Sequence, residues 1–261
     1  MTWKTNLTEI NPGEIRIKGY RQRDLMGEVT FADGVYLLFT GTLPSRAESR
    51  LFSAVLTACL DHSVTPPSAQ ATRHTTSGGA SLPSAVASGL VAVGDHHGGA
   101  MLELQKLIES VVVDSETDAE RQDRVEQVVA DYREAGENIP GFGHRYHSPD
   151  PRAETLTRML EETGLDGEYA EVAGMIRDRL HEETGVDLPL NVDGAIAVVL
   201  AELRIDASIA QAIFVIGRAA GLAAHAHEER TREAPMRDMG PSLDDIEYDG
   251  PGPREVPDRA E

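Results

Sequence analysis

The sequence predicts an all-α fold, and three observations support this. Hydrophobic residues make up 40% of the 261 residues but aromatic residues only 5%, so the apolar content is mainly aliphatic, as in packed helices. Apolar positions recur at helical spacing in most segments, and no series of alternating segments indicates a sheet. A chain of this length forms one domain, or one domain with a subdomain, around a sizeable core.

The expected helices follow one another along most of the chain. They lie at residues 31–42 (closed by Gly41), 44–61, 84–93, 100–113, 114–135, 152–182 (two helices separated at 164–167), 195–203 and 208–229. Residues 15–18 alternate like a short strand. Residues 62–82 are rich in Ser, Thr, Gly and Pro and predict a loop or a broken helix. The small apolar residues at 84–93 predict a deeply buried helix, and the end beyond Asp249 is expected to be a loose tail.

The charge distribution limits the classes of partner. The formal net charge is −20, with 44 acidic against 24 basic residues, of which only Lys4, Lys18 and Lys106 are lysines. Binding to nucleic acid or to an anionic membrane surface requires a basic face, so neither is expected. An acidic surface with few lysines is typical of a halophilic protein, because a salt-rich cytoplasm screens its self-repulsion.

The sequence offers little that would indicate a disulfide, a cysteine metal site or a targeting segment. A single cysteine, Cys59, excludes an intrachain disulfide and a cysteine metal cluster. Because Cys59 lies in an apolar run, we expect a core residue rather than a nucleophile. The N-terminus lacks the apolar core of a signal peptide and no apolar run is expected to reach membrane-spanning length, so the chain is expected to be cytoplasmic.

Polar clusters interrupt otherwise apolar or glycine-rich sequence at four places. They are Asp61-His62, His96-His97, His144-Arg145 and Asn191-Val192-Asp193. Each has a structural explanation when taken alone; Asp193, for example, would cap the helix that follows it. No spacing matches a zinc signature, and a site of three histidines from residues 62, 97 and 144 lacks a supporting pattern, so no metal is expected.

Taken together, these clusters fit carbon–carbon bond chemistry next to a carbonyl group. Such a reaction needs a carboxylate that moves a proton at carbon, neutral donors for an enol oxygen, and arginines for a polyanionic substrate. The richest stretch is 141–152, where Gly141 and Gly143 allow the backbone to approach a ligand closely. There, His144 stands beside one arginine, and Arg152 follows an Asp-Pro pair.

The same residues resemble the citrate synthase superfamily. Residues 141–146 read GFGHRY and residues 150–153 read DPRA, which is similar to the superfamily's signature. The other matching motifs, in the family's order between residues 19 and 248, are 61–62, 97–100, 192–193 and 216–225. The short span from Pro44 to Asp61 and the runs at 88–95, 190–198 and 243–248 resemble citryl-CoA lyase and the C-terminal lyase module of ATP-citrate lyase. His97 departs from that module, which carries an aromatic residue there, and resembles citrate synthases instead.

The resemblance implies a role for each site residue. Asp193 would be the acid/base at the acetyl methyl carbon, His144 would hydrogen-bond the oxygen at the breaking bond, and His97 would hold the thioester enol oxygen. The carboxylates would be bound by His62, Arg152, Arg218 and, from across a dimer interface, Arg237. Coenzyme A would contact Ile139, Gly141, Gly143 and Asn191. Arg145 would have a supporting role, and His96 and His147, which match no decisive family position, would support the site residues or face solvent. No cofactor would be permanently bound, since coenzyme A arrives as part of the substrate thioester.

The resemblance also implies a homodimer or higher homo-oligomer. Each protomer would have a large helical domain (1–102 and 218–261) and a smaller one (103–217) that closes over the site. The first hypothesis is a lyase that splits (3S)-citryl-CoA into acetyl-CoA and oxaloacetate. The second is condensation of acetyl-CoA or propionyl-CoA with oxaloacetate or another 2-oxo acid. The third is a non-catalytic citrate- or CoA-binding subunit, against which Asp193 argues, because binding alone does not need that carboxylate.

Overall fold

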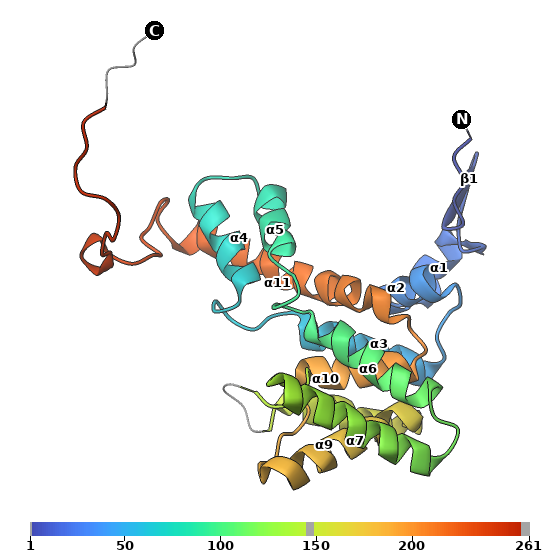
Figure 1. The fold of residues 1–261 in the computed structure, drawn as a ribbon. Coiled ribbons are helices and arrows are strands. Elements are labelled where there is room, and N and C mark those ends of the chain that lie inside the picture. Colours follow the sequence, from blue (N-terminus) through green and yellow to red (C-terminus); the bar gives the residue numbers. More distant parts are fainter. Residues whose placement is uncertain (1, 145–148, 257–261) are drawn as a thin grey trace.

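The computed structural model describes residues 2–144 and 149–256, and helices make up most of it (Figure 1). The α-helices in this described part are α1 (Gln22–Glu28), α2 (Phe31–Thr40), α3 (Arg46–Cys59), α4 (Pro67–Ser77), α5 (Leu82–Val91), α6 (Ala100–Val113), α7 (Asp118–Ala135), α8 (Pro151–Thr163), α9 (Glu168–Thr184), α10 (Val192–Glu202) and α11 (Ala210–Arg232). Two short 3₁₀ helices are η1 (Ala207–Ile209) and η2 (Leu243–Asp245). The predicted helical fold class is confirmed.

Local sequence signals place the helix ends. α2 ends where Gly41 adopts a left-handed φ of +85°. At the start of α3, the Ser45 hydroxyl accepts a hydrogen bond from the backbone of Glu48, and the Glu48 carboxylate accepts one from the backbone of Ser45. Thr117 and Glu120 form the same reciprocal cap at the start of α7. These signals fix where the helices begin before any tertiary contact is considered.

A small sheet adds to the helices near the N-terminus. Its strands are β1 (Thr8–Asn11), β2 (Glu14–Ile17) and β3 (Tyr20–Arg21). They pair antiparallel in the order β1-β2-β3, with Thr8 opposite Ile17. The short strand expected at 15–18 is therefore part of a sheet that the sequence pattern did not reveal. The hairpin projects away from the helical body (Figure 1).

The expectation for residues 62–82 needs correction, because this segment contains the continuous helix α4. Its buried face is polar: Ser68 and Thr72 expose no surface, and Arg73 only 7%. Hydrophobic periodicity detects apolar faces, so a helix that buries hydroxyl groups and an arginine gives no such signal.

The expected deep burial of residues 84–93 is wrong. Only Ala85 and Gly89 of α5 are buried, and Val91 is 82% exposed. The small residues allow close packing against α4 and α11, while the rest of α5 is half-buried or exposed. A Cβ at Gly89 would lie 2.1 Å from the Thr72 Oγ1 atom, so α4 and α5 touch there because that side chain is absent.

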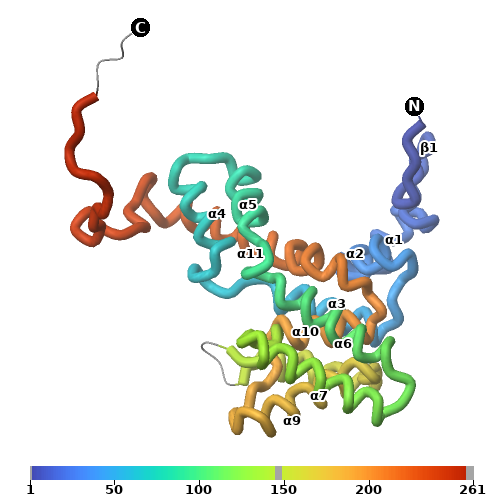
Figure 2. Tube along the Cα trace, in the orientation of Figure 1, coloured from blue at the N-terminus to red at the C-terminus, as the bar shows by residue number. Residues whose placement is uncertain are grey.

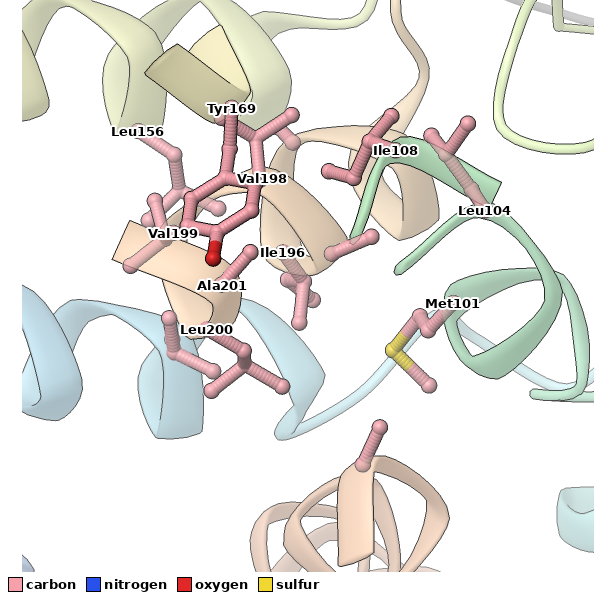
Figure 3. Close-up of a cluster of buried hydrophobic side chains, with 14 of the residues drawn as sticks. Met101, Leu104, Ile108, Leu156, Tyr169, Ile196, Val198, Val199, Leu200 and Ala201 are labelled. Carbon is pink, nitrogen blue, oxygen red and sulfur yellow. The ribbon is translucent and has the colours of Figure 1, made fainter. Parts of the chain in front are cut away.

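Helix α10 lies at the centre of the core (Figure 3). Every residue from Gly194 to Ala201 is buried, as expected of a helix that is apolar on all sides. It packs against α3, α6, α8 and α9. Figure 3 shows Leu104 and Ile108 of α6 and Leu156 of α8 around Ile196. The N-terminal end of α10, which carries Asp193, is therefore held by a rigid interior.

Helix α11 crosses the molecule against α3, α4 and α5 (Figure 2). By length and composition alone, the segment Ala207–Arg232 is long and apolar enough to span a membrane, contrary to the expectation that no run reaches that length. It nevertheless carries Arg218 and Glu229, which are 3% and 2% exposed, toward the protein interior. Of its most apolar stretch, 39% is buried against the rest of the protein. Beyond it, the C-terminal segment extends away from the helices (Figure 2).

Of the residues assigned to a smaller domain, 103–217, helices α7 to α10 occupy the lower part of the molecule in Figure 1, whereas the first turns of α11 lie above them. One hydrophobic cluster joins them to the rest, since Leu51 and Phe52 of α3 belong to the same core as Leu104 and Ile196. The domain boundaries and the closing movement stay predictions.

Candidate active site

A cavity of about 300 Å³ lies where the C-terminal end of α3, the N-terminal ends of α8 and α10 and the N-terminal half of α11 meet the segments that precede α4 and α6. It brings together these sequence-predicted residues: His62, His97, His144, Arg152, Asn191, Asp193 and Arg218. His96, Cys59 and Phe214 also line it. Within the described ranges, no group of three or more His, Cys, Asp or Glu side chains is placed to hold a metal ion.

Asp193 is the second residue of α10. Asn191 caps this helix, its side-chain oxygen accepting a hydrogen bond from Gly194 N at 3.0 Å, so the capping role considered for Asp193 is excluded. Burial raises the pKa of the Asp193 carboxyl, Asp150 adds to the rise, and Arg152 and Arg218 oppose it. A carboxyl group with a raised pKa keeps its proton to higher pH, which suits a group that gives and takes protons.

The segment Gly141–Gly143 lies alongside the segment that leads into α10. Asn191 N donates to Gly141 O at 2.9 Å, and the Asn191 side-chain amide donates to Gly143 O at 2.9 Å. Gly141 has a φ of +83°, and a Cβ there would lie 2.9 Å from Gly194 Cα. These two backbones approach so closely that position 141 requires glycine. The predicted coenzyme A contacts 141 and 143 therefore also fix the start of the Asp193 helix.

Arg152 is held by the fully buried carboxylate of Asp150. Arg152 Nε donates to Oδ1 at 3.1 Å and Nη2 donates to Oδ2 at 2.8 Å, while Asp150 Oδ1 also caps α8 by accepting from Arg152 N. His144 Nε2 lies 3.9 Å from Asp150 Oδ2. Burial opposes ionisation of Asp150, but the Arg152 contacts outweigh it and lower the pKa of the carboxyl. Asp150 also accepts from Val192 N at 3.3 Å, linking Arg152 to the residue next to Asp193.

Arg218 places a buried cation in the cavity wall. Its Nε donates to Cys59 O at 2.8 Å, and its guanidinium carbon lies 4.9 Å from the Phe214 ring centre. Its Nη1 atom is buried and has no hydrogen-bond partner within the described part of the chain. A buried donor of this kind calls for an anionic ligand. Burial lowers the pKa of Arg218.

The expected core role of Cys59 agrees with its position. The side chain is 1% exposed, and burial, with Asp193 nearby, raises the pKa of the thiol to about 12. A thiol in this state is a poor nucleophile, because the thiolate is the reactive form.

His97 is held by a serine of α4. Its Nε2 lies 2.8 Å from the hydroxyl of the fully buried Ser68, and its ring packs edge-on against Phe214. Burial and the charge of Arg218 lower the pKa of His97, so the ring is kept neutral. When the Ser68 hydroxyl donates to Nε2, the ring hydrogen sits on Nδ1 and is available to an acceptor.

The cavity thus combines a carboxyl group with a raised pKa, the neutral imidazole of His97 and two guanidinium groups. On another wall, the rings of His62 and His144 have centres 6.1 Å apart. This set can bind a polycarboxylate, polarise carbonyl oxygens and move a proton at an adjacent carbon.

Comparison with known families agrees with this chemistry. Residues 44–238 match the family described as "Citrate synthase, C-terminal domain". The chain belongs to the citrate synthase family. A curated relative in this family, the citrate synthase of Haloferax volcanii, is 32% identical over 205 residues, which cover 76% of this chain and 51% of the relative. The chain therefore spans about half the length of the curated relatives it matches.

Two solved structures are similar to this chain over almost its full length. The citryl-CoA lyase of Hydrogenobacter thermophilus is 39% identical and superposes with a TM-score of 0.90, covering 98% of both chains. The ATP citrate lyase of Methanothrix soehngenii, solved with citrate and coenzyme A, shares the fold with a TM-score of 0.80 at 21% identity, over 95% of this chain and 43% of that one. The resemblance to the citrate synthase superfamily, and to its lyase branch, is confirmed.

Four predicted site residues lie outside the cavity. Ile139 is 4% exposed and lines a second cavity of about 550 Å³ between α7 and α9. Gly141 and Gly143 serve the backbone contact described above. Arg237 pairs with Glu229, with Nη2 and Oε2 2.8 Å apart, and its role across a dimer interface stays a prediction. The supporting residues Arg145 and His147 fall outside the described residues, whereas His96 is exposed at the cavity rim.

Two residues with clear roles in the site were missed. Asp150 was seen only as part of a motif, although the Asp-Pro-Arg sequence itself signals a helix cap next to an arginine. Ser68 gave no signal, because it lies 29 residues from His97 in a segment that reads as a loop.

Proposed function

We propose that the chain is a citryl-CoA lyase, which cleaves (3S)-citryl-CoA into acetyl-CoA and oxaloacetate. The observation that carries the chemistry is the carboxyl group of Asp193, with its raised pKa, beside Arg152 and Arg218 in a cavity that His97 and His144 also line. The choice of cleavage is supported by the match over almost the full length of both chains to a citryl-CoA lyase.

Cleavage needs two proton movements and no redox step. The hydroxyl group on the tertiary carbon of citryl-CoA gives its proton to His144, and the electron pair of that O–H bond becomes part of the new carbonyl of oxaloacetate. The broken carbon–carbon bond leaves its electrons in the enol(ate) of acetyl-CoA, whose carbon takes a proton from Asp193. This direction requires Asp193 to begin protonated, which its raised pKa supports.

The remaining groups stabilise charge. Neutral His97 donates a hydrogen bond to the thioester oxygen as enol character develops, a contribution of about 3–4 kcal/mol where such a donor has been removed from other enzymes. Arg152, Arg218 and His62 bind the carboxylates, and the unpartnered Nη1 of Arg218 is a donor available for one of them.

Coenzyme A would lie along the segment 139–143, with the cavity beside Ile139 available to its nucleotide end. Because coenzyme A is part of the substrate, no resident cofactor is needed. Closure of the smaller domain would exclude water from the thioester, and a homodimer would bring Arg237 to the partner's site.

Condensation of an acyl-CoA with oxaloacetate is the second candidate. It is supported by the 32% identity to the Haloferax volcanii citrate synthase and by a histidine at position 97. The same residues would then act in reverse, with an ionised Asp193 removing a methyl proton.

A pair of assays on the protein purified at high salt separates the two. Citryl-CoA is offered first, and oxaloacetate is followed through malate dehydrogenase. Acetyl-CoA with oxaloacetate is offered next, and free thiol is followed. The lyase proposal expects rapid oxaloacetate formation in the first assay. Thiol release in the second without oxaloacetate in the first would overturn it in favour of condensation, and inactivity in both would favour a binding subunit.

A further inference from the structure

His225 on α11 is buried, lies outside the cavity and has no part in the mechanism above. Its ring lies between two charged side chains, with Nε2 2.8 Å from Asp61 Oδ1 and Nδ1 3.2 Å from Arg73 Nη1. A guanidinium group can only donate hydrogen bonds, so Nδ1 must be the acceptor. The ring hydrogen therefore sits on Nε2 and is donated to Asp61, which leaves the ring one tautomer and one orientation.

Arg73 is anchored on the far side of the ring. Its side chain is 8% exposed, its Nη1 donates to Glu228 Oε2 at 2.8 Å, and its Nε lies 2.8 Å from Glu229 Oε2. Glu229 is itself 2% exposed and also holds Arg237. The donor that faces His225 is thus fixed by two ion pairs, of which the Arg73–Glu229 pair is buried on both sides, and removing one partner of such a buried pair strongly destabilises a protein.

Asp61 in turn stabilises the backbone turn that carries His62. Its Oδ2 accepts a hydrogen bond from Ser63 N at 2.9 Å. Ser63 adopts a φ of +65°, a conformation that is uncommon for residues other than glycine. The turn therefore needs stabilising hydrogen bonds from surrounding side chains. Partial burial opposes ionisation of Asp61, but the hydrogen bonds from Ser63 and His225 outweigh it and lower the pKa of the carboxyl.

A direct backbone contact fixes the spacing between His225 and Asp61. Gly217, Gly221 and His225 follow at intervals of four residues and so share one face of α11. A Cβ at Gly221 would lie 1.9 Å from Leu60 O, the carbonyl just before Asp61. Helix α11 therefore touches the end of α3 there, and His225 reaches Asp61 one turn further on.

We propose that His225 is a positioning residue for His62, acting through Asp61, so that the cavity is preorganised to receive a substrate carboxylate. This inference rests on the proposed function, in which His62 binds that carboxylate. Asp61, Arg73 and His225 hold the His62 turn in its binding geometry without touching the substrate.

The test is oxaloacetate binding to the full chain at high salt, measured by titration calorimetry. We expect His225→Leu to weaken binding about tenfold, the scale of one hydrogen bond to a charged group. His225→Gln keeps a donor toward Asp61 and should recover most of the affinity. The matched control is His227→Leu, since His227 is exposed two residues further along α11 and should leave binding unchanged.

A double-mutant cycle separates positioning from a general loss of stability. In a His62→Ala background, His225→Leu should weaken oxaloacetate binding no further, because the residue it acts through is absent. An equal further loss in that background, or unchanged binding by His225→Leu in the wild-type background, would overturn the inference. Failure of the wild type to bind oxaloacetate would instead overturn the proposed function, and this inference with it.

A second measurement needs no ligand and applies even if the leucine variant does not fold. Nitrogen-15 chemical shifts of the wild-type protein, assigned with His225→Gln, should show an unprotonated Nδ1 and a protonated Nε2 for His225. A protonated Nδ1 would contradict the geometry on which the inference depends.

Discussion

Replacing Asp150 by Asn tests how Arg152 is held in the cavity. The carboxylate accepts hydrogen bonds from Arg152 N and Nε at Oδ1, and from Arg152 Nη2 and Val192 N at Oδ2. An asparagine that keeps its oxygen at the Oδ1 position points its NH₂ group at the other two donors. One charge-assisted and one ordinary hydrogen bond are then lost, which amounts to about 2–4 kcal/mol of unfolding free energy.

The effect of Asp150→Asn should depend on pH in a defined direction. Because the pKa of Asp150 is lowered in the folded protein, its contribution is present above the ordinary pKa of an aspartate and is lost as pH falls through the lowered value. Urea unfolding at neutral pH should therefore separate the variant from the wild type, and unfolding at strongly acidic pH should bring them together. The value of kcat/KM should fall by about a hundredfold, because a misplaced Arg152 no longer orients the substrate.

Exposed Asp166→Asn is the matched control and should change the unfolding free energy by less than about 0.5 kcal/mol. If Asp150→Asn unfolds and turns over like the wild type, Asp150 does not position Arg152, and the reasoning from hydrogen-bond geometry is refuted.

Three further predictions concern stability and reactivity. Glu202→Ala should destabilise the protein by about 1–2 kcal/mol in urea unfolding, because Glu202 Oε1 accepts hydrogen bonds from three backbone N–H groups at the start of α9. An unchanged unfolding midpoint would contradict this capping role. Gly221→Ala should lower the free energy of unfolding by about 1–3 kcal/mol, because the added methyl group would lie 1.9 Å from the backbone oxygen of Leu60. An unchanged Tm in calorimetry would disprove that contact. Cys59 should resist alkylation by iodoacetamide at pH 8 until the chain is unfolded, because the pKa of its thiol is about 12; rapid labelling of the native protein would refute its burial.

Much of the fold could be predicted because local signals and burial agree. The apolar run 195–203 is buried on every side in α10, and Gly41 and Ser45 mark helix ends that the structure reproduces. The prediction was wrong where a helix buries polar residues or leaves small apolar residues exposed. Helix α4 buries Ser68 and Thr72, so its sequence reads as a loop. Helix α5 carries small residues where it packs against α4 and α11, and its other residues are half-buried or exposed.

The candidate site followed a similar pattern. The resemblance to the citrate synthase superfamily sufficed to predict that Asp193, His97 and Arg218 belong to one site, and all three line one cavity. The partners that orient these groups are set by tertiary packing. His225 meets Asp61 across 164 residues of chain, and no spacing rule within the sequence connects them.

The most direct test of the central claim is the rate at which an Asp193→Asn variant forms oxaloacetate from citryl-CoA. Asparagine matches the shape of the carboxyl group but has no acidic proton to give to the enol carbon. We predict a fall in kcat of about 10²–10⁴-fold, the usual contribution of a general acid. Cleavage by the variant at the wild-type rate would contradict the assignment of Asp193 as the acid that completes acetyl-CoA.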